Sequence, residues 1–291
     1  MSAITQTEID QQVFSLYDEY CHGRIDRREF LKRAGALGAL GLAISLLPDY
    51  ARAQTISFTD QRIKAQYLTY PSPGGNAANM RGYLVHPAGQ GPFPTVLVVH
   101  ENRGLNPYIE DVARRAAVEG YLALAPDGLA PVGGYPGNDD DGRELQAKLD
   151  QPKLRNDMLN GAKFLKSHKL STGKLGVTGF CWGGGTTNWL ATALGADMHA
   201  GAPYYGVAAA TADVPKIKAP LLVHLAENDP RVNETYATYE QELKKAGARY
   251  EIHMYPGTQH GFHNNSTPRY NESAAKLAWD RTVAFFKKNL A

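Results

Sequence analysis

Cysteine is scarce in this chain of 291 residues, which has only Cys21 and Cys181. Two cysteines cannot build the dense disulfide framework of small secreted domains, and the chain is long enough to bury a core without one. A charge bias is also missing, because the formal net charge is only +2 and no basic block is interleaved with aromatic residues. These absences argue against a nucleic-acid partner and against a structural role for sulfur.

Long hydrophobic runs are missing too. The apolar stretch at residues 34–47 is rich in Gly and Ala and is too short to span a bilayer comfortably. Arg27 and Arg28 precede it, and Ala51 and Ala53 offer the small residues that a signal peptidase reads. This pattern resembles a bacterial twin-arginine signal and predicts cleavage after Ala53.

Such cleavage would divide the chain into a signal segment, residues 1–53, and a domain of residues 54–291. The domain would be periplasmic or secreted, the twin-arginine export machinery would be a partner, and the mature domain would bind no membrane. An alternative is a helical extension that stays attached, because residues 11–20 also have a helical pattern. In that case the protein would stay in the cytoplasm.

Strands and helices alternate from residue 66 onward, which predicts an α/β fold with a mostly parallel sheet and helices on both faces. Strand patterns occur at residues 66–70, 81–86, 95–99, 121–125, 174–179, 200–205, 220–225 and 250–255. The first two predict an antiparallel hairpin, joined through the turn-forming residues 71–76. The expected architecture is therefore one domain with a sheet of about seven or eight strands.

Helical spacing fills the intervals between these strands. Helices are predicted at residues 106–119, 152–167, 183–194, 234–246 and 271–290. Residues 127–151 are instead rich in Gly, Pro and Asp, which predicts a long loop. Loops of that length in a compact domain are usually functional or disordered.

A cysteine between glycines is the main chemical signal, in the sequence Gly179-Phe180-Cys181-Trp182-Gly183. An apolar strand precedes it and a helix start of small residues follows, which is the context of a nucleophile elbow. In such an elbow the nucleophile sits on a strained turn, and glycine on either side avoids collisions. Backbone N–H groups and the positive helix end would also favour a thiolate there.

A thiol nucleophile needs a proton acceptor and a group that orients it. Asp229 follows the apolar strand at 220–225, and His260 follows the strand at 250–255. Because the carboxyl ends of parallel strands meet at one edge of a sheet, Cys181, Asp229 and His260 are predicted to converge. The order nucleophile, acid, histidine is that of the α/β-hydrolases.

These motifs together resemble the dienelactone hydrolase family, and the likeness extends over about residues 60–291. Members carry a glutamate after an early central strand, and here Glu101 occupies that position. The resemblance implies that Glu101 takes the thiol proton when substrate binds. It also implies that the backbone N–H groups of Asn102 and Trp182 form an oxyanion hole.

The resemblance implies hydrolysis of an ester or lactone through a thioacyl enzyme, without a cofactor. The resemblance says less about the substrate. The family's serine and arginine after the histidine are replaced here by Gly261 and Asn264. Loss of that arginine removes a bidentate contact to a substrate carboxylate. Arg143 could supply another cation. Aromatic residues that could line an acyl pocket are Tyr135, Trp182, Tyr204 and Tyr205.

Several simpler interpretations stay open from the residues alone. Cys181 could be a small buried hydrophobic residue, Asp229 an ordinary turn residue, and the tyrosines packing residues against the sheet. The function could instead be that of a redox-active thiol protein or of a non-catalytic binding protein on a hydrolase scaffold.

Two other chemistries find little support in the sequence. His253, His260 and His263 lie on a strand and loop without metal-ligand spacing, so no metal site is expected. The glycines at 183–185 follow bulky residues where a dinucleotide loop needs close backbone approach, so no such cofactor is expected either.

Overall fold

The structure is a computed structural model and describes residues 12–13, 16–17, 19–20, 25, 27–38 and 54–291. The predicted cleavage point after Ala53 and most of the apolar run at residues 34–47 lie outside this described part. No helix within the described part is both long and apolar enough to cross a membrane.

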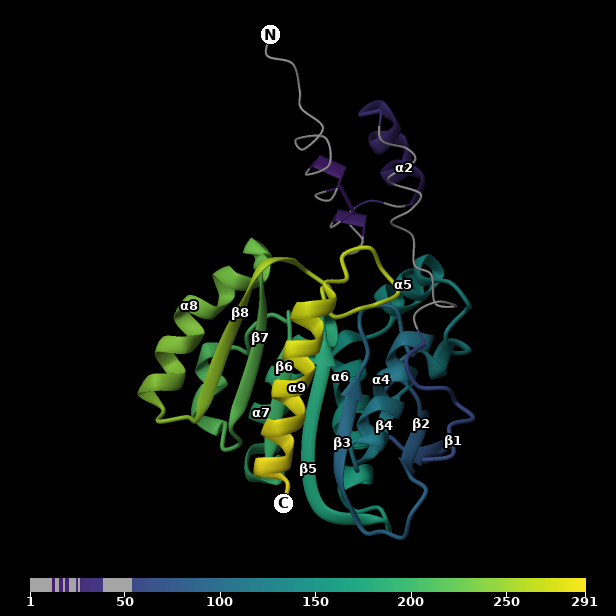
Figure 1. The fold of residues 1–291 in the computed structure, drawn as a ribbon, viewed down its shortest axis with the longest axis vertical. Coiled ribbons are helices and arrows are strands. Elements are labelled where there is room, and N and C mark those ends of the chain that lie inside the picture. Colours follow the sequence, from purple (N-terminus) through teal and green to yellow (C-terminus); the bar gives the residue numbers. More distant parts are fainter. Residues whose placement is uncertain (1–11, 14–15, 18, 21–24, 26, 39–53) are drawn as a thin grey trace.

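Eight strands within residues 54–291 form one sheet, shown in Figure 1. They are β1 (Ile63–Pro71), β2 (Asn79–Pro87), β3 (Phe93–Val99), β4 (Leu122–Pro126), β5 (Ser171–Phe180), β6 (Ala200–Tyr204), β7 (Leu221–Asn228) and β8 (Tyr250–Gln259). Their order across the sheet is β1-β2-β4-β3-β5-β6-β7-β8. β1 and β2 form the predicted antiparallel hairpin and β2 is antiparallel to β4, whereas all pairs from β4 to β8 are parallel. The predicted α/β fold is confirmed.

Helices cover both faces of this sheet. One face packs against α6 (Gln151–Lys166), α7 (Trp182–Leu194) and α8 (Pro230–Lys245), and the other against α4 (Pro107–Val118) and α9 (Glu272–Asn289). The two faces are built by the alternation of side chains along each strand. On β3, for example, Leu97 and Val99 belong to one buried core, and Val96 and Val98 belong to the other.

The loop predicted at residues 127–151 is in part a helix, so that prediction was wrong there. Helix α5 spans Asp139–Lys148, and the side-chain oxygen of its N-cap Asn138 accepts a hydrogen bond from the Asp141 backbone N–H at 2.9 Å. Three aspartates in the first turn also suit the positive end of a helix. The Gly and Pro residues just before Asn138 are typical of loops, and for this reason the sequence pattern did not indicate a helix start there.

The N-terminal part contains its own small group of buried side chains. Helix α2 spans Arg27–Ala36 and appears in Figure 1 beyond the end of the sheet nearest α5. The described residues within the predicted helical segment 11–20 are helical as well. Their apolar side chains pack with those of α2 in a cluster of Val13, Tyr17, Tyr20, Phe30 and Ala34.

Candidate active site

Cys181 sits at the sharp turn between β5 and α7. Its backbone dihedral angles are φ 55° and ψ −114°, in a region that side chains with a Cβ rarely adopt. Such a conformation costs on the order of 1–3 kcal/mol and persists only where the surrounding structure imposes it. The geometry is that of a nucleophile elbow, as the sequence predicts.

The neighbouring glycines are required because main chains approach closely on both sides. A Cβ added at Gly179 would lie 2.3 Å from the carbonyl oxygen of Gly183. A Cβ added at Gly183 would lie 2.3 Å from the carbonyl oxygen of Val99, at the end of β3. These are backbone atoms, which cannot swing aside as a long side chain can. The glycines therefore fix the position of Cys181 over the end of the sheet.

Asp229 and His260 meet as predicted. Asp229 follows β7 and His260 follows β8, two neighbouring parallel strands. The Nδ1 atom of His260 lies 2.6 Å from Oδ2 of Asp229, and both side chains are buried. A carboxylate at Nδ1 fixes the orientation and the tautomer of the imidazole, so that Nε2 is the atom left for proton transfer.

Asp229 also caps a helix. Its other carboxylate oxygen, Oδ1, accepts a hydrogen bond from the backbone N–H of Val232 at 3.4 Å, at the start of α8. The interpretation of Asp229 as a turn residue and its interpretation as the partner of His260 are therefore both correct. The cap also explains why α8 begins at Pro230, earlier than the predicted residue 234.

One pocket collects most of the predicted site residues. Its lining includes Cys181, His260, Glu101 and Asn102, with Gly261 and Asn264 from the loop after β8. Trp182 begins α7, its ring stacks on the imidazole of His100 at 5.5 Å, and its backbone N–H bonds to the Cys181 thiol. The structure thus brings together a thiol, an imidazole and a carboxylate that are far apart in the sequence.

Glu101 is buried and shares a hydrogen bond with Asn264. The Nδ2 atom of Asn264 donates to Oε2 of Glu101 at 2.9 Å. Burial raises the pKa of the Glu101 carboxyl, whereas the nearby Arg103 guanidinium and this hydrogen bond act in the opposite direction. Asn264 therefore contacts the carboxylate of Glu101 directly.

The surroundings of the Cys181 thiol oppose its ionisation. Burial raises its pKa to about 12, the charge of Glu101 adds to the rise, and Arg231 and Arg103 oppose it. The sequence predicts that the helix start favours a thiolate, and the Trp182 backbone N–H does lower the pKa of the thiol, against the larger effect of burial. Desolvation of a charged sulfur and a like charge nearby outweigh the favourable helix end.

Sequence reasoning missed four residues of this pocket. Arg103, Thr267 and Arg269 line it, and so does Tyr17 from the N-terminal part of the chain. Arg103 forms an ion pair with Asp139 on α5. Arg103 lies in the same loop as Glu101, which was a usable signal. No local signal connects Tyr17 to a pocket built by residues beyond position 100.

Four residues predicted to bind substrate do not line this pocket. The Tyr135 hydroxyl donates to Asp139 at 3.0 Å, and the Tyr204 hydroxyl lies 2.6 Å from Oγ1 of Thr282 in the core. Arg143 lies on α5, where it pairs with Asp140 at 3.2 Å. These three side chains are engaged in packing or in other pairs, and their contact with a substrate stays a prediction.

Tyr205 is the fourth residue predicted to bind substrate, and it contacts His260 instead of lining the pocket. Its ring packs edge-on against the His260 ring, with centroids 5.1 Å apart, and it is fully buried. It therefore helps to fix the imidazole rather than contacting the space around the thiol.

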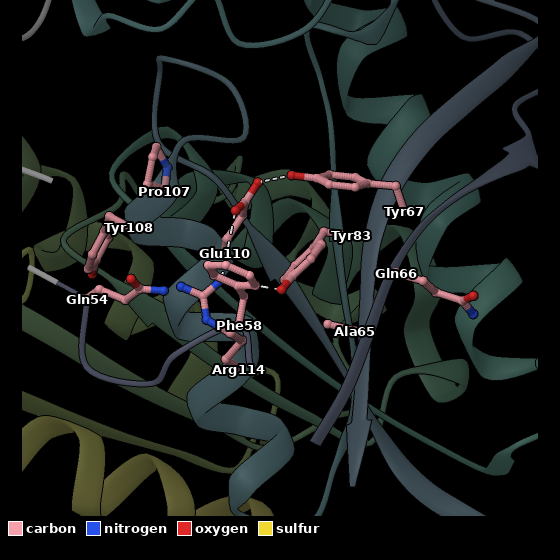
Figure 2. Close-up of a pocket in the computed structure, with 10 residues that line it drawn as sticks. All are labelled: Gln54, Phe58, Ala65, Gln66, Tyr67, Tyr83, Pro107, Tyr108, Glu110 and Arg114. Atoms are coloured by element: carbon pink, nitrogen blue, oxygen red, sulfur yellow. Dashed lines mark hydrogen bonds and ion pairs between the residues drawn. The ribbon is translucent and has the colours of Figure 1, made fainter. Parts of the chain in front are cut away.

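A second hollow of about 350 Å³ lies between β1, β2 and α4, away from the thiol (Figure 2). Figure 2 shows Glu110 between Tyr67 and Arg114, and the Tyr67 hydroxyl donates to Glu110. Arg114 in turn donates to the Tyr83 hydroxyl at 3.3 Å, so the polar groups satisfy one another. No group of three His, Cys, Asp or Glu side chains suited to a metal gathers within the described residues.

Comparison with known proteins agrees with the geometry. The model of the dienelactone hydrolase family matches residues 80–290. The chain belongs to the dienelactone hydrolase family. Family membership supports hydrolysis of ester bonds on an α/β-hydrolase fold. A second match, described as YqhI-like, covers residues 1–39.

Relatives of this dienelactone hydrolase-like protein are found in enterobacteria. It is 32% identical to the "Putative carboxymethylenebutenolidase" of Escherichia coli, over 81% of this chain and 92% of the relative. It is 65% identical to the "Putative hydrolase fragment YghX" of the same organism, over 38% of this chain and 96% of the fragment. The crystal structure of a "Putative Dienelactone Hydrolase" from Klebsiella pneumoniae superimposes with a TM-score of 0.67 and 29% identity, covering 77% of this chain and 99% of that one.

Replacing Gly183 with Ala should destabilise the dienelactone hydrolase domain. The new methyl group would collide with main-chain oxygen 2.3 Å away, so β3 or α7 must shift. We expect a loss of about 1–3 kcal/mol in the free energy of unfolding, measured by denaturant titration. Gly89→Ala is the control, because a Cβ there meets nothing within 4 Å. Equal stability of the two variants would contradict the close approach at the elbow.

Proposed function

We propose that the protein hydrolyses ester or lactone bonds with Cys181 as nucleophile, His260 as acid and base, and Asp229 as the group that orients the histidine. The observation that carries this proposal is the convergence of the three in one place. Cys181 and His260 share a pocket, and Asp229 contacts His260 at 2.6 Å. A nucleophile, a proton carrier and an orienting carboxylate are the parts required for acyl transfer.

In the proposed first step Cys181 transfers its proton to Glu101, and the sulfur attacks the carbonyl carbon of the substrate. A C–S bond forms, and the backbone N–H groups of Asn102 and Trp182 stabilise the negative oxygen. The C–O bond to the alcohol then breaks, and the leaving oxygen takes the proton that Glu101 received from Cys181. The product of this step is a thioacyl enzyme.

In the second step His260 removes a proton from water, which attacks the thioester carbonyl carbon. The C–S bond breaks, a carboxylic acid leaves, and the sulfur takes the proton that His260 removed from water. Asp229 stays ionised throughout and stabilises the imidazolium of His260. The chemistry needs no cofactor.

The electrostatics of the pocket support a thiol that becomes reactive only with substrate. A pKa of about 12 keeps Cys181 neutral at neutral pH. Burial raises the pKa of the Glu101 carboxyl toward that of a better base, and the hydrogen bond from Asn264 opposes this rise. The proposed substrates are esters and lactones in general. A carboxylate on the substrate is not required, because the chemistry needs only the carbonyl group that the sulfur attacks.

Replacing Cys181 with Ser tests the nucleophile. Turnover of 4-nitrophenyl acetate should fall at least about a hundredfold, because the pocket is arranged for a more acidic proton than that of a hydroxyl. Cys21→Ser is the control and should keep full turnover. Thermal unfolding of both variants checks the fold.

Undiminished turnover by Cys181→Ser would overturn the thiol mechanism. Absent turnover in the wild type, with a sulfenic acid detected on Cys181, would favour the redox function instead.

Replacing Glu101 with Gln should separate two properties of the thiol. Removing the negative charge lowers the pKa of Cys181, so alkylation by iodoacetamide at pH 8 should become faster, by up to about tenfold per pKa unit. Acylation by the ester should become slower, because the proton acceptor is lost. Stopped-flow release of 4-nitrophenol measures acylation.

Glu272→Gln, an exposed carboxylate on α9, is the matched control and should change neither rate. If the Glu101→Gln variant is acylated as fast as the wild type, Glu101 is not the base.

We further propose that residues 1–53 direct export through the twin-arginine machinery, so that the domain of residues 54–291 acts in the periplasm or outside the cell. The support is the motif itself, because Arg27 and Arg28 precede an apolar run and Ala51 and Ala53 precede the proposed cleavage point. Mass spectrometry of the periplasmic protein should find Gln54 as its first residue. An intact Met1 on that protein would refute cleavage.

A further inference from the structure

The pocket that contains Cys181 is covered by a residue from far away in the sequence. Tyr17 lines it together with Cys181 and His260, and the Tyr17 side chain is fully buried. The space left in the pocket is about 10 Å³. That is room for about one water molecule and far too little for an ester. The N-terminal part of the chain therefore forms part of the wall of this pocket, in which Cys181 keeps only partial exposure.

Two tyrosines attach this part to the mouth of the pocket. The guanidinium carbon of Arg269 lies 4.4 Å from the centroid of the Tyr17 ring, and that of Arg143 lies 4.4 Å from the centroid of the Tyr20 ring. The Tyr20 hydroxyl also donates to Asp140, which pairs with Arg143. Cation–π contacts gain strength where water is excluded. The two tyrosines and the two arginines of these contacts are all buried.

The tyrosines are presented by a unit that packs on itself. The ring of Phe30 on α2 stacks on Tyr20 at 5.3 Å and contacts Tyr17 at 5.7 Å. Arg33 pairs with Glu29 at 2.7 Å and with Glu19 at 3.5 Å, which ties α2 to the preceding residues. Because these contacts fix the two rings relative to each other, both can dock with little further loss of side-chain freedom.

We propose that the described residues between 12 and 36 form an intramolecular plug of the Cys181 pocket, held by Tyr17 on Arg269 and by Tyr20 on Arg143 and Asp140. The docking surface is the pocket mouth, and its partner is this chain's own N-terminal segment. Substrate reaches the thiol only when the plug is released. The inference rests on the proposed function, and the proposed cleavage after Ala53 would make that release permanent.

The test uses the full chain with Cys21→Ser, so that Cys181 is the one thiol labelled. Tyr20→Ala removes the anchor that lies outside the pocket lining, and Tyr17→Ala/Tyr20→Ala removes both anchors. Alkylation of Cys181 by iodoacetamide is followed by mass spectrometry. Alkylation requires an open pocket, so its rate scales with the open fraction. We expect it to rise at least about tenfold in the double variant and by a smaller factor in Tyr20→Ala.

Lys32→Ala is the matched control, because Lys32 is an exposed residue of the same helix α2. Its alkylation rate should equal that of the wild type. Equal rates in all four proteins would overturn the plug. If Tyr20→Ala and the double variant react faster but no protein turns over 4-nitrophenyl acetate, the plug stands and the proposed hydrolase function fails. Thermal unfolding shows whether the domain is intact, and Tyr20→Ala carries the test if the double variant is not.

Discussion

The close approach of main chains around Cys181 is the constraint on which the site depends. The turn between β5 and α7 holds this residue at φ 55°, and Gly183 lets the start of α7 touch the end of β3. That contact puts the thiol beside the loop of Glu101, which follows β3 directly. The strain of the turn is tolerated because the sheet and α7 bury large apolar surfaces on either side.

Asp229 shows how the fold and the chemistry share one residue. One of its carboxylate oxygens caps the N-terminus of α8, and the other orients the imidazole of His260. The start of α8 thus fixes the carboxylate of Asp229, and this carboxylate fixes the imidazole of His260. The ring of Tyr205 packs against the same imidazole. A histidine held in this way loses little freedom when it accepts or returns a proton. The site is rigid on this side, whereas the opposite side is closed by Tyr17 from another part of the chain.

Burial and the charges around the thiol have opposite effects on its pKa, and burial is the largest of them. Burial and Glu101 raise the pKa of Cys181, and Arg231 and Arg103 only partly compensate. A neutral thiol in a covered pocket is a poor target for oxidants and alkylating reagents, since the thiolate is the reactive form. Glu101 is buried beside Asn264, so a carboxylate that could accept the thiol proton, as proposed, lies within the site. Reactivity then depends on what enters the pocket.

The sequence by itself determined the order of strands and helices and the elbow, because these rest on local periodicity and on glycines at fixed spacing. It also predicted Asp229 and His260, since the carboxyl ends of parallel strands share one edge. Only the tertiary structure decided that Tyr204 is a core residue, that α5 carries Asp139 to Arg103, and that Tyr17 covers the pocket. Contacts between segments so distant in the chain depend on how finished elements pack, and no local pattern records that packing.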